Sequence, residues 1–176
     1  REQLFDVDLE GNDLNVWLYQ TARQAISFGH VGVLVDAPKE GDKTRPYWVT
    51  YTPKDILGWR SEIIDGSRQL TQLRLMEQVV EPDGKYGDKI IKQIRVLERG
   101  RYEIHRKDDK KNEYRLFDEG EMSLKDKIPF AVAYSNRVSF YESRSPLYDI
   151  AELNLKHYQI QSDLDNILHI SSVPLL

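Results

Sequence analysis

The chain has 176 residues, of which 40% are hydrophobic and 31% are charged, and its formal net charge is −4 at pH 7. This acidic balance excludes an overall electrostatic attraction to nucleic-acid phosphates or anionic membranes. The absence of cysteine excludes disulfides, thiolate zinc sites and thiol nucleophiles, and no apolar run approaches the roughly 20 residues that span a bilayer, so we expect no membrane partner.

The N-terminal part predicts a helix followed by a buried strand. Asn12 or Asp13 is a suitable N-cap, and apolar residues recur at helical spacing over residues 14–26. Gly29 can end this helix in the left-handed conformation. The short apolar run over residues 31–35 then indicates a strand buried on both faces.

A series of strands separated by turn residues follows. The predicted strands are residues 46–51, 59–64, 70–80, 89–98, 101–107, 113–117 and 128–134. Turn signals such as Asp65-Gly66 and Gly100 lie between them, and one helical turn is expected from Thr52 to Ile56. Because sequential strands with short connections pair antiparallel, the fold class is α+β, with an N-terminal helix, a mostly antiparallel β meander and a long C-terminal helix.

The C-terminal stretch predicts the longest helix of the chain. Ser145 can cap its start and Pro146 suits the first helical position. Apolar residues then recur every three to four positions over residues 147–170, which at 1.5 Å per residue gives a rod of about 36 Å. Tyr148, Leu155 and Ile170 lie outside this main stripe, so a single neighbour would not cover all the apolar residues. We expect the helix to pack at its start on the sheets and to project beyond them.

The four histidines do not predict a metal site. His157 and His169 share the long helix but lie about 120° apart around its axis and about 18 Å apart along it. His30 suits a cation at a helix C-terminus, and His105 falls in the polar alternation of a strand. No phosphate-binding loop or nucleophile elbow is present either. The sequence therefore predicts no catalytic residue, no metal and no cofactor.

Two further functions remain to be considered from the sequence. Pro82-Asp83 followed by Asp108-Asp109-Lys110 is the kind of set with which a metal-dependent nuclease holds a cation and a phosphate. Both groups fall in predicted turns, where the same residue types occur for reasons of backbone geometry. A weak nuclease is thus the second alternative, and the first is a non-catalytic interaction module that oligomerises through the C-terminal helix.

A pattern of scattered residues runs along most of the chain and is strongest near its end. At the C-terminal end it comprises Pro146-Leu147, Ala151-Glu152-Leu153-Asn154, His157-Tyr158, Ser162-Asp163, Asn166, Leu168-His169 and Pro174. Upstream, Gly29 with the run VGVLVD, Arg45-Pro46-Tyr47, Trp59-Arg60 and Ile128-Pro129-Phe130 occur in the same order. This pattern resembles the portal proteins of tailed double-stranded-DNA phages, in particular a portal-like family of phage and prophage proteins of uncharacterised function.

The resemblance implies a non-catalytic structural subunit. Portal subunits form a ring, usually a dodecamer, at one capsid vertex, where double-stranded DNA passes without sequence specificity. Terminase, capsid and head-completion proteins bind this ring, which is part of the virion after assembly in the cytoplasm of the bacterial host. Residues 1–142 would form a wing-like α+β domain, and residues 143–176 a stem-like helix and the start of a following strand.

Two further expectations come with the resemblance. Because the chain opens on Arg1 and stops within the apolar stretch SSVPLL, we expect it to be a piece of a longer polypeptide, with the clip, the returning stem helix, the tunnel loop and the crown lying beyond Leu176. The candidate subunit-interface or channel residues are Leu147, Ile150, Asn154, Lys156, His157, Tyr158, Asp163 and Asn166.

Overall fold

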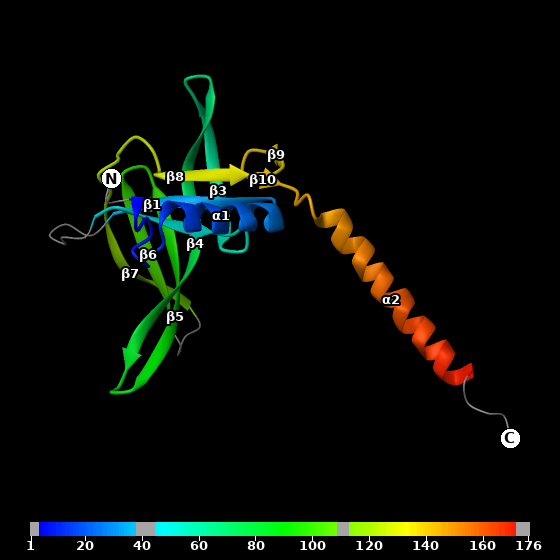
Figure 1. The fold of residues 1–176 in the computed structure, drawn as a ribbon. Helices are drawn as coiled ribbons and strands as arrows, with labels where there is room; N and C mark the ends of the chain where they lie inside the picture. The colour runs from blue at the N-terminus through cyan, green and yellow to red at the C-terminus, as the bar shows by residue number, and fades with distance from the viewer. Residues whose placement is uncertain (1–3, 38–44, 109–112, 172–176) are drawn as a thin grey trace.

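The computed structural model describes residues 4–37, 45–108 and 113–171, and it has the α+β architecture that the sequence predicts (Figure 1). A three-stranded and a five-stranded antiparallel sheet pack together, helix α1 lies along the smaller sheet, and helix α2 extends away from both sheets. The apolar stretch at the end of the chain, SSVPLL, lies almost entirely outside the described residues, as do Asp109 and Lys110.

Helix α1, Leu14–Phe28, begins and ends where its caps predict. The side chain of Asp13 accepts a hydrogen bond from the amide of Val16 at 2.9 Å, and this bond pairs an amide that has no partner within the helix. Gly29 ends the helix with φ of 92°, and its amide donates to Ala25 O. The inward face carries Trp17, whose ring lies edge-on against Trp48 with centroids 4.8 Å apart.

The small sheet has β1, His30–Asp36, between β2, Tyr47–Tyr51, and β8, Phe130–Tyr134. The predicted strand over residues 31–35 is confirmed. The prediction that both of its faces are buried is wrong at the C-terminal end of the strand. Leu34 is buried against the larger sheet, whereas Val35 on the opposite face is 43% exposed. That opposite face lies against a single helix, α1, which leaves the end of the strand open (Figure 1).

The larger sheet is the predicted meander, in the order β3-β4-β5-β6-β7 with every neighbouring pair antiparallel. Its strands are β3, Ile56–Ile64, β4, Ser67–Asp83, β5, Gly87–Glu98, β6, Arg101–Asp108, and β7, Glu113–Glu121. The helical turn expected from Thr52 to Ile56 is wrong. The Asp55 amide donates to Thr52 O at 2.9 Å in a single turn, and pairing with β4 already begins at Ile56.

The core lies between the two sheets. It is formed by Leu34, Tyr51, Leu73, Leu75, Leu97, Ile128 and Tyr141. After β8, a short hairpin that the sequence did not predict, β9, Arg137–Ser139, and β10, Glu142–Ser143, brings Tyr141 into this core. The chain then leaves the sheets and enters α2, Tyr148–Ser171.

Candidate interaction surface on helix α2

Helix α2 starts where the sequence predicts. The Ser145 hydroxyl accepts a hydrogen bond from the Leu147 amide at 3.1 Å, and the Tyr148 amide donates to Ser145 O at 3.1 Å. Helical structure runs over 24 residues, Tyr148–Ser171, within one residue of the predicted range at each end. No Gly or Pro lies within it, so nothing interrupts the backbone hydrogen bonds.

None of the residues of α2 is buried. Leu153 is 68% exposed, Ile160 is 67% exposed and Tyr158 is 71% exposed, and the helix extends away from the sheets (Figure 1). The predicted projection is therefore confirmed. The expected packing of its start on the sheets is wrong, because the contact is with the end of another helix: the Ser145 hydroxyl donates to Ile26 O of α1 at 3.0 Å.

Most of the apolar side chains of α2 form two stripes, whereas Ile170 lies between them on the side of Glu152. The long stripe repeats with spacings of three and four residues, and it consists of Ile150, Leu153, His157, Ile160, Leu164 and Ile167. The short stripe has the same spacing and consists of Tyr148, Ala151, Leu155 and Tyr158. At about 100° per residue the centres of the two stripes lie about 170° apart around the helix. The helix thus presents apolar surface on two opposite sides.

Polar residues separate the two stripes. The wider of the two surfaces between the stripes is named here the polar band, and its polar residues are Glu152, Lys156, Gln159, Asp163 and Asn166. On the other side lie Asn154, Gln161 and Asp165, where the Gln161 side-chain amide donates to the Asp165 carboxylate at 3.0 Å. Near the start, Glu152 also accepts a hydrogen bond from the Tyr148 hydroxyl, which raises the pKa of that hydroxyl.

The eight candidate residues do not form one site. Ile150 and His157 belong to the long stripe, and Tyr158 belongs to the short stripe, with Leu147 just before the helix. Lys156, Asp163 and Asn166 belong to the polar band, and Asn154 lies on the remaining side. The candidates are therefore spread over four sides of one exposed helix, a distribution suited to contacts with several neighbours rather than to binding one small ligand.

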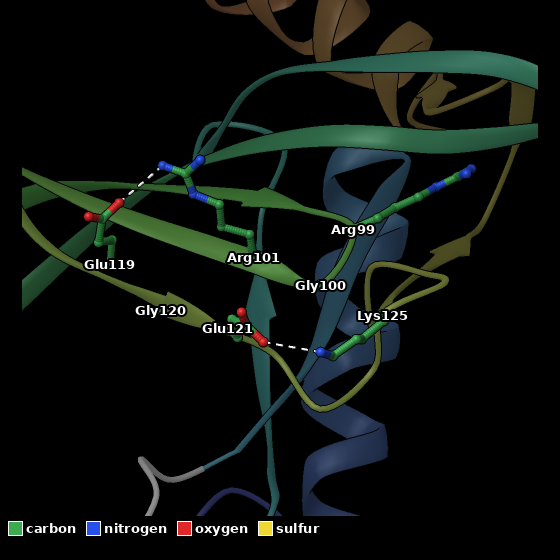
Figure 2. A pocket seen from close by; sticks show the side chains of 7 residues that line it. All are labelled: Arg99, Gly100, Arg101, Glu119, Gly120, Glu121 and Lys125. Atoms are coloured by element: carbon green, nitrogen blue, oxygen red, sulfur yellow. Dashed lines mark hydrogen bonds and ion pairs between the residues drawn. The ribbon is translucent and has the colours of Figure 1, made fainter.

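The hollow between β5, β6 and β7 has a different character. It encloses about 400 Å³ and is lined by Arg99, Gly100, Arg101, Glu119, Gly120, Glu121 and Lys125 (Figure 2). Arg101 pairs with Glu119 at 3.0 Å and Lys125 with Glu121 at 3.1 Å, while the Arg99 side chain points away and donates to Gln69 at 3.1 Å. Because two of its three cations already have carboxylate partners, the hollow lacks the concentrated positive charge that holds a phosphate.

The histidines lie at separate places. His30 is buried with Nδ1 2.6 Å from Ser143 Oγ, and burial lowers its pKa. His105 contacts Glu103 at 3.0 Å on the larger sheet, and His157 and His169 lie on different sides of α2. Within the described ranges, no three His, Asp or Glu side chains come together as metal ligands.

The residues of the nuclease hypothesis are described only in part. Asp83 ends β4 and pairs with Gly87 at the tip of the β4–β5 hairpin. Asp109 and Lys110 lie outside the described residues, so their distance from Asp83 is not defined.

Neither helix in the described part of the chain combines the length and the hydrophobicity that a bilayer crossing requires.

A group of residues around the start of α2 was missed by the sequence reasoning. Gly29 and His30 follow α1, whereas Ser143 and Ser145 precede α2, and the structure brings the four together. The sequence carries little sign of this because the His30–Ser143 contact joins residues 113 positions apart. Only the helix-capping roles of Gly29 and Ser145 could be read locally.

Comparison with known proteins adds one match at the same end of the chain. The profile of a domain of unknown function (DUF4055) matches residues 146–176, which include the whole of α2. No curated protein matches the chain significantly.

Proposed function

We propose that this chain is part of a portal subunit of a tailed double-stranded-DNA phage, and that it acts structurally rather than catalytically. In this proposal, residues 1–142 are the wing-like domain and α2 is the start of the stem that surrounds the DNA channel. The observation that carries the proposal is the exposure of α2 on all sides, with apolar stripes on two opposite sides.

Two opposite stripes suit a ring better than a dimer. A subunit in a closed ring has one neighbour on each side, and each contact joins two different surfaces of the same chain. The long stripe of one copy can then face the short stripe of the next. A two-fold dimer built on one stripe would leave the other in water, at a cost that scales with its apolar area.

The polar band is the side that we assign to the channel. It combines Glu152 and Asp163 with a single cation, Lys156, so it gives no strip of positive charge. Each phosphate that a cation neutralises adds affinity through counterion release, and a conduit through which DNA must slide benefits from few such contacts. The net charge of −4 over the chain supports the same proposal.

The proposed partners follow from this role. They are further copies of the subunit, terminase, capsid and head-completion proteins, and double-stranded DNA that passes without sequence-specific contacts. The proposed location is the virion, after assembly in the cytoplasm of the bacterial host. Within this scheme the polar band meets DNA, while the sheets, which lie away from α2, are left for protein partners (Figure 1).

Negative-stain imaging of the full-length protein tests the proposal. We expect ring-shaped particles with a central opening, since the assembly is closed and cyclic, and about twelve subunits, the usual number in the portal proteins that the sequence resembles. Compact two-fold particles would instead favour the interaction module that dimerises through α2. Monomers at micromolar concentration would contradict assembly through this helix altogether.

A further inference from the structure

We propose that the direction in which α2 leaves the protein is set by a serine clasp, defined as Gly29, His30, Ser143 and Ser145, and not by packing along the helix. The clasp is a conformational device at the root of α2: when it is closed the helix is held in one direction, and when it opens the helix can swing. This role is separate from assembly and concerns a single copy of the chain.

One hydroxyl group joins the ends of the two helices. Ser145 Oγ donates to Ile26 O in the last turn of α1 at 3.0 Å and accepts from the Leu147 amide at the start of α2 at 3.1 Å. Carbonyl groups at the end of a helix and amide groups at its start have no partners within that helix. The same side chain therefore pairs one such group from each helix and fixes the two ends against each other.

Gly29 makes this close approach possible. Its φ is +92°, and a Cβ added there would lie 2.5 Å from Ser143 Oγ and 2.9 Å from both Arg144 C and Ser145 N. Real Cβ atoms do not approach backbone atoms so closely, so any side chain at position 29 would push residues 143–145 away from the end of α1. The segment that leads into α2 is thus seated directly on this glycine.

His30 holds the other serine of the clasp. Its Nδ1 lies 2.6 Å from Ser143 Oγ, and the side chain is buried beside the ring of Tyr134, with centroids 5.8 Å apart. Since His30 begins β1, this hydrogen bond ties the segment before α2 to the central strand of the small sheet.

Few other contacts restrain α2. Every residue from 147 to 171 is exposed. Arg144 stiffens the junction through its ion pair with Asp149 at 2.5 Å and its position over the Tyr148 ring, and its amide donates to Asn136 O at 3.2 Å. The ion pair and the ring contact stay within the segment that moves with the helix. The clasp contributes two hydrogen bonds, His30–Ser143 and Ser145–Ile26, that connect that segment to the rest of the protein, beside the Arg144–Asn136 bond and the pairing of Ser143 with Arg137.

Distance measurement between spin labels tests the clasp. The chain has no cysteine, so Arg23→Cys on α1 and Gln159→Cys on α2 give two defined labelling positions, both exposed. Dilution with unlabelled protein removes distances between copies. We expect one narrow distribution of distances between the two labels in this double-cysteine protein, which serves as the parent. Adding Ser145→Ala or Gly29→Ala should make that distribution about twofold wider, because the restraint on the helix is lost.

Ser135→Ala is the matched control. Its hydroxyl donates to Ala25 O at 2.7 Å and to Gly29 O at 3.0 Å, so it binds the same end of α1 but makes neither of the two clasp hydrogen bonds. We expect the parent width to be kept in this variant. Should Gly29→Ala fail to fold, Ser143→Ala replaces it. The proposal is overturned if folded Ser145→Ala and Ser143→Ala both give a distance distribution as narrow as that of the parent, or if the parent itself gives a broad one.

Discussion

Arg95 on β5 reaches across the core to Asp36 on β1, with 2.6 Å between Nη1 and Oδ2, and so joins the two sheets. Its Nε lies 2.9 Å from Glu77 Oε1, although the N–H is not directed at that oxygen, and Glu77 also accepts from the Tyr51 hydroxyl at 2.6 Å. The two carboxylates raise the pKa of Arg95 and outweigh its desolvation. The sheets are thus held together by a largely buried ion network as well as by apolar contacts.

Arg95→Ala should lower the free energy of unfolding by about 3 kcal/mol, because it leaves two largely buried carboxylates without their cation. Urea denaturation of the 176-residue chain measures this. Arg68→Ala is the control, since that side chain is exposed and donates only to Ser61 at 3.1 Å among the contacts described. A loss in Arg95→Ala no larger than in the control would show that the network does not hold the sheets together.

Acidification should destabilise the protein through His30. Burial lowers the pKa of His30 below its ordinary value of 6.5, so the neutral form is favoured in the folded state. The stability that depends on this neutral form is complete above pH 6.5 and is lost as the pH falls toward the lowered pKa of the folded state. Thermal unfolding at a series of pH values from 7.5 to about 5 measures the slope.

His30→Gln cannot titrate and should flatten this dependence, even if its stability at pH 7.5 is lower. The matched control is His157→Gln on the exposed surface of α2, which should keep the parent slope. Equal slopes in His30→Gln and the parent would mean that another group causes the pH dependence.

Charges placed on the stripes should block assembly without unfolding the chain. Ile160→Glu changes the long stripe and Leu155→Glu changes the short stripe, where the side chains are 67% and 59% exposed. Because these substitutions remove no buried contact, the free energy of unfolding should change by less than about 0.5 kcal/mol. In the full-length protein each variant should shift the particle mass from rings to single subunits.

Gln159→Glu adds the same charge to the polar band and should leave ring formation intact. Loss of assembly in the long-stripe variant alone would indicate a dimer built on one stripe, and equal loss in all three variants would indicate a general effect of charge on α2.

The chain should not cleave DNA. Incubation of the full-length protein with supercoiled plasmid and Mg²⁺ or Mn²⁺ should leave the plasmid intact, because Asp83 lies at a hairpin tip where turn geometry accounts for it. Gel electrophoresis measures nicking and linearisation. Metal-dependent cleavage that is abolished by Asp83→Ala or Asp109→Ala would replace the structural role with a nuclease.

Local chemistry predicted the elements of this fold well. Asp13 and Gly29 set the ends of α1, Ser145 set the start of α2, and the turn at Asp65-Gly66 set the first hairpin of the meander. Each of these signals acts over a few residues, so it can be read without knowledge of the fold. The expected helical turn from Thr52 to Ile56 was wrong because the local sequence of a single turn and that of a helix start are alike. Pairing of the chain with β4 from Ile56 onward, which is not a local signal, decided between the two.

Contacts between distant segments could not be predicted. The pairing of Arg95 with Asp36 joins residues 59 positions apart, and the contact of Ser145 with Ile26 joins residues 119 positions apart. Neither has a local pattern, because each depends on how the sheets and helices pack.

The candidate surface on α2 could be predicted in part. The main stripe and the apolar residues outside it, such as Leu155, followed from the spacing, but the exposure of α2 on all sides did not, because it depends on what packs against the helix.

Mass photometry of the full-length protein tests the central proposal most directly, because it measures the mass of individual unstained particles and so gives the number of subunits in each. The proposal predicts a main species of about twelve subunits that is lost in both Ile160→Glu and Leu155→Glu. A main species of two subunits, unaffected by Leu155→Glu, would contradict it.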